Sequence, residues 1–240
     1  MSEPMLKISV EGNIATLTMN RPDKRNAMCE ALLGDLDTFF SNPPKEVRVV
    51  IITGTAGHYC SGLDLSEHVH RSAEENLYHS RAWHGVMEKI QFGGLAVVSA
   101  MFGAVIGGGL EIAAATHVRI AEPSTIFQLP EGRRGIFVGG GATARVGRLI
   151  GADRMTEMML TGRKYNADEG LALGLTHYSV GEGEALELAQ QLAGKVSRNA
   201  PVSNYMMIQS ISRINDMSQS DGLFTESLVA AMSQRTPDAE

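Results

Sequence analysis

A run of three glycines joins an apolar segment of strand length to an apolar segment of helical composition. The segment 95–102 is short, apolar and uncharged, which is typical of a buried strand. Residues 110–116 are rich in alanine, which favours a helix buried in a larger core. Gly107 to Gly109 therefore connect a strand to a helix. Glycine there allows positive φ and close approach of a ligand, and the first amides of a helix have no internal partner.

Two acidic side chains accompany this turn. Glu111 falls in the first turn of the predicted helix, and Glu131 follows the next apolar segment. A glycine triplet is more often a tight turn than an active site, and an acid at a helix start is more often a favourable terminus. An acid flanked by Leu110 and Ile112 is nevertheless costly to bury without a partner or a task. Two carboxylates near exposed amides indicate acid/base chemistry on a carbonyl compound.

Length and charge limit the class of protein. The 240 residues are enough for one large domain or a domain with an appendage, and 43% hydrophobic residues permit a sizeable core. The net charge of -6 comes from interspersed acids and bases, so we predict no nucleic-acid partner. Cys29 and Cys60 show no disulfide or metal spacing, which favours a reducing compartment, by default the cytoplasm. Residues 93–110 are uncharged but rich in glycine, so we predict no membrane span.

Strand and helix patterns alternate along most of the chain. Strands are predicted at residues 6–10, 14–19, 47–53, 95–102 and 117–121, and helices at 29–40, 74–91, 110–116, 143–150 and 155–160. A second glycine-rich turn, residues 54–65, directly follows a strand and also offers amides to a ligand. This alternation predicts an α/β fold.

The character of the chain changes after residue 181. Amphipathic helices are predicted at residues 183–198, 201–214 and 218–233. We therefore predict a core of residues 1–181 and a helical oligomerisation region of residues 182–240. Residues 236–240 have the composition of a further helix start, with a threonine cap, a proline and acids. We expect the native chain to continue beyond Glu240 with a last helix.

Four motifs, in this order, resemble those of the crotonase (enoyl-CoA hydratase/isomerase) superfamily. They are Asn20-Arg21-Pro22 with Asn26-Ala27, then YCSGLDL at 59–65, GGGLE at 107–111 and FQLPE at 127–131. Each is weak alone, but their order and spacing along most of the chain are specific. The resemblance implies a crotonase-like ββα spiral core with a C-terminal α-helical trimerisation module. It also implies a homotrimer or a dimer of trimers.

The resemblance implies an enoyl-CoA hydratase, which adds water in the syn sense across the C2=C3 bond of a 2-enoyl-CoA and yields 3-hydroxyacyl-CoA. Backbone amides of Leu63 and Gly108 correspond to the oxyanion hole of the thioester oxygen. Glu111 corresponds to the group that activates water, and Glu131 to the group that delivers a proton to C2. No metal or redox cofactor is implied, because coenzyme A is part of the substrate.

The resemblance also implies a set of substrate-contacting or CoA-contacting positions: Lys24, Arg25, Ala27, Ser61, Gly62, Asp64, Leu65 and Gly139. A solvated surface pair is nearly as good an account of Lys24 and Arg25 as a phosphate contact. For Asp64, a structural role within its own turn is the stronger interpretation. Residues 132–138 depart from the family by lacking a proline and carrying two arginines, which leaves the acyl group open.

Several alternatives stay open. An isomerase of the same fold would move a double bond with one glutamate, and an aryl-CoA hydratase-lyase would release an aldehyde. Dienoyl isomerisation is disfavoured because it would need an acid at Gly139. A non-catalytic acyl-CoA or RNA-binding scaffold is the alternative from another class, although the negative charge disfavours RNA.

Two further groups of side chains have competing interpretations. His68, His70, His79 and His84 lack metal-binding spacing, so we predict exposed or packing histidines and no metal site. Trp83, Met87 and Ile90 share one helix stripe that forms either core or the wall of an acyl pocket.

Overall fold

The computed structural model describes residues 3–67 and 71–234 of the chain. Its central element is a six-stranded sheet in the order β1-β2-β3-β4-β6-β8. The strands are β1 (Leu6–Glu11), β2 (Ile14–Met19), β3 (Val49–Gly54), β4 (Ala96–Met101), β6 (Val118–Ala121) and β8 (Tyr178–Ser179). β1 and β2 form an antiparallel hairpin, with Leu6 opposite Met19. All other neighbouring pairs in this sheet are parallel.

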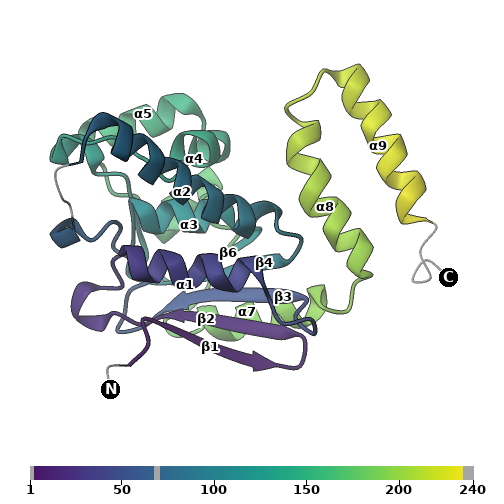
Figure 1. The fold of residues 1–240 in the computed structure, drawn as a ribbon, viewed down its shortest axis with the longest axis horizontal. Helices are drawn as coiled ribbons and strands as arrows, with labels where there is room; N and C mark the ends of the chain where they lie inside the picture. The colour runs from purple at the N-terminus through teal and green to yellow at the C-terminus, as the bar shows by residue number, and fades with distance from the viewer. Residues whose placement is uncertain (1–2, 68–70, 235–240) are drawn as a thin grey trace.

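Parallel strands require long crossover connections, and helices supply them here. α1 (Glu30–Ser41), α2 (Ala73–Phe92) and α3 (Gly108–Ala115) lie over one face of the sheet (Figure 1). α2 begins with a capping box, in which Ser72 and Glu75 satisfy each other's backbone amides. α3 is buried along its whole length, as its alanine-rich sequence predicts.

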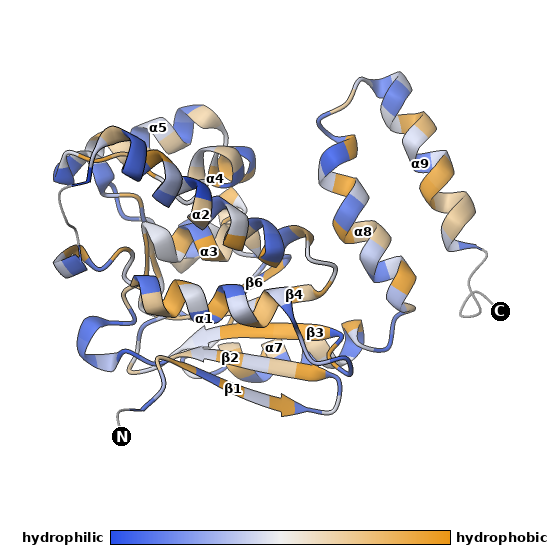
Figure 2. Ribbon diagram, in the orientation of Figure 1, coloured by the Kyte–Doolittle hydropathy of each residue, from blue (hydrophilic) through white to orange (hydrophobic). Residues whose placement is uncertain are grey.

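Alternating side chains of the central strand pack on opposite faces of the sheet. Val50 and Ile52 join the core under α1, α2 and α3. Val49 and Ile51 pack on the other face, against the buried alanines of α7 (Ala185–Val196). Because both faces are covered, β3 is hydrophobic along most of its length (Figure 2). The predicted α/β class is confirmed.

α7 belongs with the sheet rather than with the helices that follow it. Its residues Ala185, Ala189 and Ala193 are fully buried beside strands β3, β4 and β6. A domain boundary at residue 182 would cut through this core, because α7 supplies the cover of one sheet face. We therefore propose that the boundary lies after α7, in residues 197–200.

Short elements complete the core. β5 (Ala104–Ile106) and β7 (Ile126–Gln128) form a separate parallel pair. α4 (Ala142–Ile150), α5 (Ala152–Thr161) and α6 (Ala167–Leu173) follow, with single-turn helices η1 (Pro22–Lys24), η2 (Leu65–Glu67) and η3 (Glu131–Arg134). β5, β7, β8 and α6 are not predicted from the sequence, because segments of two to seven residues are too short to show a clear periodicity. A bridge between Cys60 and Val105 places the 54–65 turn beside the glycine triplet.

The last two helices stand beside the core. α8 (Pro201–Ile214) and α9 (Gln219–Ser233) form an antiparallel pair, and α9 packs mainly on α8 (Figure 1). The further helix start expected at residues 236–240 lies outside the described residues. Among the helices of residues 3–67 and 71–234, none has the length and apolar composition to cross a membrane.

Candidate active site

Two backbone amides meet at the start of α3. A Cβ built on Gly108 would lie 3.7 Å from the Leu63 amide nitrogen, and one built on Gly62 would lie 3.6 Å from the Gly108 nitrogen. Gly107 has φ 51°, a conformation that favours glycine, and it turns the chain into the helix. As the first helical residue, Gly108 has no intrahelical acceptor for its amide. Leu63 and Gly108 thus bring two amide donors together from segments far apart in the sequence.

The Glu111 carboxylate is buried and held by a second turn. Its Oε1 accepts hydrogen bonds from the amides of Gly140, at 2.8 Å, and Ala142, at 3.1 Å. Burial raises the pKa of Glu111, while these amides and the Arg145 guanidinium act in the opposite direction. Its Oε2 is close to Gly140, since a Cβ there would come within 2.4 Å of it. The carboxylate is therefore fixed through one oxygen.

Glu131 begins η3 and lies beside Gly107, the first residue of the glycine triplet. Its Oε2 is buried without a hydrogen-bond partner, and its Oε1 would lie 2.9 Å from a Cβ built on Gly107. Burial, with a smaller contribution from the nearby Glu111, raises the pKa of Glu131 to about 7. An acid with this pKa can hold a proton near neutral pH and give it up.

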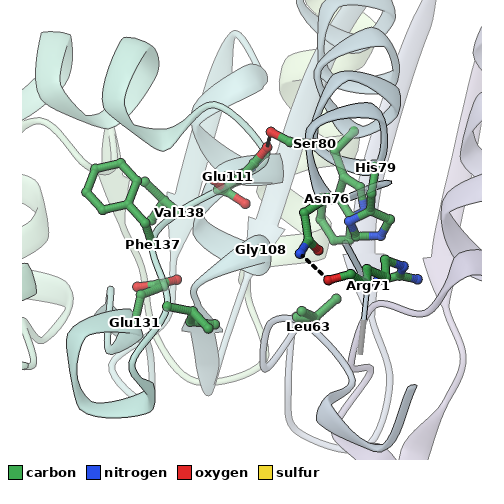
Figure 3. A pocket seen from close by; sticks show the side chains of 14 residues that line it. Leu63, Arg71, Asn76, His79, Ser80, Gly108, Glu111, Glu131, Phe137 and Val138 are labelled. Atoms are coloured by element: carbon green, nitrogen blue, oxygen red, sulfur yellow. Dashed lines mark hydrogen bonds between the residues drawn. The ribbon is translucent and has the colours of Figure 1, made fainter. Parts of the chain in front are cut away.

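All four groups line one cavity of about 440 Å³. Figure 3 shows Glu111 and Glu131 on the side of Val138 and Phe137, with Asn76, His79 and Arg71 opposite them. Trp83 also lines the cavity, and its ring carbons come within 3.2 Å of a Cβ built on Gly108. Trp83 is at the same time 5% exposed and part of the main core. Both interpretations of the Trp83 stripe are thus correct for this residue.

The predicted CoA-contacting residues divide into two groups. The 21–28 and 60–66 segments lie together: Ser61 Oγ donates to the Lys24 carbonyl at 3.1 Å, and the Ser61 amide donates to the Arg25 carbonyl at 3.1 Å. Ala27, Gly62 and Leu65 belong to the same two segments. Gly139 instead lines the cavity beside Ser80.

Asp64 is occupied by protein partners. Its carboxylate pairs with Arg21 at 2.7 Å and accepts from the Ser66 hydroxyl at 2.6 Å. These hydrogen bonds, with the nearby Lys24 ammonium, hold the pKa of Asp64 well below its usual range. Asp64 is buried and is not a wall of the cavity. Its predicted substrate contact stays a prediction, and we propose that Asp64 holds the two segments together.

The histidines do not form a metal centre in the part of the chain that the structure describes. There, no three His, Cys, Asp or Glu side chains are grouped closely enough to hold a metal ion. His68 and His70 lie outside the described residues. His79 pairs with Glu30 at 2.7 Å, and His84 lies near Gly141.

The sequence did not single out several residues around the site. Ser80 and Asn76 line the cavity from α2, and Arg145 reaches back from α4 to the turn that holds Glu111. An isolated serine, asparagine or arginine on a helix has no distinctive spacing. The glycine turn at 139–141 could have indicated that side chains from other elements pack against it, but not which ones.

A crotonase-like fold with two carboxylates and paired amides in one cavity defines a class of acyl-CoA enzymes. The family model of enoyl-CoA hydratase/isomerase matches residues 9–236, and the chain belongs to this family. The resemblance inferred from the four motifs is confirmed.

Relatives and solved structures agree with this family. The short-chain-enoyl-CoA hydratase of Clostridium acetobutylicum is 32% identical over 206 residues, which are 85% of this chain and 79% of that protein. The enoyl-CoA hydratase domain-containing protein 2, mitochondrial, of Bos taurus is 32% identical over 233 residues, 94% of this chain and 78% of that protein. A solved Rhodopseudomonas palustris structure, named provisionally as an enoyl-CoA hydratase, is 44% identical with a TM-score of 0.96. The alignment covers 98% of this chain and 91% of that one.

Proposed function

We propose that the protein is an enoyl-CoA hydratase, which adds water across the C2=C3 bond of a 2-enoyl-CoA thioester. The observation that carries this proposal is the presence of both Glu111 and Glu131 in the cavity where the Leu63 and Gly108 amides meet. Hydration needs one group that takes a proton from water and one that gives a proton to carbon. The names of the Clostridium and Bos taurus relatives support the same reaction class.

In the proposed first step, the ionised Glu111 takes a proton from water while the water oxygen bonds to C3. The electron pair of the C2=C3 bond moves toward C1, and negative charge develops on the thioester oxygen. The Leu63 and Gly108 amides donate hydrogen bonds to that oxygen. Each such donor contributes about 2.7 to 4 kcal/mol to transition-state stabilisation in comparable oxyanion holes.

In the second step, Glu131 transfers its proton to C2 and the thioester carbonyl re-forms. The unpaired Oε2 and the pKa of about 7 fit the role of a proton donor. The balance is one water added, and exchange with solvent restores the protonation of both carboxyls. The steps use only protein groups and water, so no cofactor is required.

The cytoplasm stays our predicted compartment; both cysteines are free and buried.

Loss of the conjugated enoyl-thioester absorbance tests the proposal directly. Purified protein is mixed with crotonyl-CoA, longer enoyl-CoAs and cinnamoyl-type CoA, and the product is identified as 3-hydroxyacyl-CoA. We expect rapid loss with wild type and a fall of about 100-fold or more in Glu111→Gln and in Glu131→Gln, with acyl-CoA binding retained. Wild-type turnover in either variant would rule out its assigned role.

The main rival is a double-bond isomerase of the same family. A relative from Zymoseptoria tritici is named an enoyl-CoA isomerase/hydratase, which supports this alternative. Isomerisation needs one glutamate, so Glu111→Gln would remain active on a 3-enoyl-CoA. Production of an aldehyde would instead identify a hydratase-lyase. Acyl-CoA binding without turnover of any substrate would indicate a scaffold.

We also propose that α8 and α9 mediate self-association into a trimer or a dimer of trimers. Large apolar side chains on these two helices and their connection are exposed to solvent: Tyr205, Met207, Ile211, Met217, Leu223, Phe224, Leu228 and Met232. Apolar exposure of this extent on one pair of helices supports an interaction surface there.

A further inference from the structure

The Glu111 carboxylate is oriented by a turn that has no rigidity of its own. Residues 139–141 are three consecutive glycines, and Gly141 has φ 102°. Glycine loses the most conformational freedom on folding, so such a turn is ordered only by its surroundings. Its amides must nevertheless stay aimed at Glu111, because the Gly140 and Ala142 amides donate to Oε1.

Helix α2 holds this turn at two points. Ser80 Oγ donates to the Gly139 carbonyl at 2.7 Å. Farther along the helix, Gln91 Oε1 accepts from Arg145 Nε at 2.7 Å, and Arg145 Nη1 donates to the Gly140 carbonyl at 3.3 Å. The turn is thus bound through the carbonyls of Gly139 and Gly140, while its amides donate to Glu111. Figure 3 shows Ser80 and Glu111 as neighbours at the cavity.

Arg145 also leaves no room for a side chain on the turn. A Cβ built on Gly141 would come within 2.2 Å of Arg145 Nη1. The guanidinium is largely buried, which lowers the pKa of Arg145, and Glu88 of α2 and Glu111 oppose this effect. Arg148 of α4 and His84 of α2 are the other titratable groups near it, and Glu131 faces Glu111 from η3. The Arg145 charge is therefore held close to the carboxylate of Glu111.

We propose that Ser80, Gln91 and Arg145 are positioning residues that fix the 139–142 turn and, through its amides, the orientation and ionisation of Glu111. This inference rests on the proposed role of Glu111 in activating water. These residues do not touch the reacting atoms in this account. They act by keeping the carboxylate where water must be deprotonated, and small displacements of such a group cost up to about 100-fold in rate.

The test compares Arg145→Met, Arg145→Lys and Ser80→Ala with wild type. Arg163→Met is the control, since Arg163 is a surface arginine paired with Glu157 and Glu169. Hydration kinetics are measured across pH, and the Glu111 carboxyl is titrated by NMR with ¹³C-labelled glutamate, assigned with Glu111→Gln. Thermal melts establish that each variant is folded.

We expect Arg145→Met to lower kcat about 10- to 100-fold with KM changed less than about twofold. Loss of the guanidinium and of aligned amides raises the pKa of Glu111, so the acid limb of the kcat profile and the NMR midpoint move to higher pH. Arg145→Lys keeps the charge and returns the midpoint toward wild type. Ser80→Ala shifts it in the same direction as Arg145→Met.

An unchanged Glu111 midpoint in Arg145→Met and Ser80→Ala, or a kcat loss no larger than that of Arg163→Met, would overturn the proposal. A rise in KM without loss of kcat would also overturn it, by assigning these residues to substrate binding. If wild type hydrates no enoyl-CoA, the proposed function fails, and the NMR midpoints alone decide whether the turn controls Glu111.

Discussion

At the scale of single residues, the site has no room for a side chain at Gly140, because an added carbon would displace the Glu111 carboxylate. Gly140 supplies an amide to Glu111, and its α-hydrogen lies where a Cβ would come within 2.4 Å of Glu111 Oε2 and 3.0 Å of Trp83. Neither neighbour can withdraw freely, because both are buried. Close packing at this point thus sets the position of the Glu111 carboxylate.

We therefore predict that Gly140→Ala reduces hydration about 100-fold, because the added methyl displaces Glu111 by a fraction of an ångström or more. Steady-state kinetics with an enoyl-CoA measure the loss. Gly85→Ala is the matched control, since its new methyl on α2 meets no atom within 4 Å. Equal activity of the two variants would show that the Glu111 position tolerates the change.

The raised pKa of Glu131 also predicts how stability depends on pH. The folded carboxyl ionises at about 7, against the ordinary value of 4.5, so ionisation favours the unfolded state between these pH values. Wild type thus loses stability as pH rises through this window, by about 3 kcal/mol at most at 1.36 kcal/mol per pKa unit. Glu131→Gln cannot ionise and avoids this loss.

We accordingly expect Glu131→Gln to be more stable than wild type at pH 8, and the difference to shrink toward pH 4.5, in urea unfolding at several pH values. Glu46→Gln, an exposed glutamate, serves as the control and should leave the pH dependence unchanged. A Glu131→Gln curve parallel to that of wild type would show that the carboxyl is not perturbed in the folded protein.

At the scale of elements, α7 packs in the core, although the sequence pattern assigned this helix to the C-terminal helical region. Its buried stripe is made of Ala185, Ala189 and Ala193, each fully buried against the sheet. Alanine allows the helix axis to approach the strands closely. The close approach leaves no volume for a larger side chain.

Ala189→Leu is therefore predicted to destabilise the protein by about 1 to 3 kcal/mol through overpacking. The free energy of unfolding in urea measures this change. Gln190→Leu places the same side chain at the next, exposed position of the helix and should have little effect. If Ala189→Leu were equally well tolerated, α7 would not be part of the core, and the boundary at residue 182 would stand.

At the scale of the whole molecule, the α8–α9 pair exposes large apolar side chains that no other part of the described chain covers. Phe224 is 66% exposed and Leu228 is 53% exposed on α9. We predict that Phe224→Lys with Leu228→Lys lowers the molar mass measured by sedimentation to that of a single chain, because charge replaces the apolar contact. Glu226→Lys makes the same change in net charge on the same helix and should leave the assembly intact. Unchanged mass in the double variant would place the interface elsewhere.

The sequence by itself determined the types of most elements. Period-two and period-3.6 patterns follow from local geometry, so β1 to β4 and most helices could be predicted to within a few residues. The resemblance of the four motifs to those of a known family also predicted Leu63, Gly108, Glu111 and Glu131 as site residues, and all four line one cavity. Family membership was predictable for the same reason.

Only the tertiary structure decided what those residues experience. The raised pKa of Glu131, the amides on Glu111 and the hold of α2 on the 139–142 turn come from contacts between segments far apart in the chain. The sequence favoured a structural role for Asp64, but only the structure showed that its partners are Arg21 and Ser66. Burial and proximity arise when the chain folds on itself, and local pattern carries no record of them.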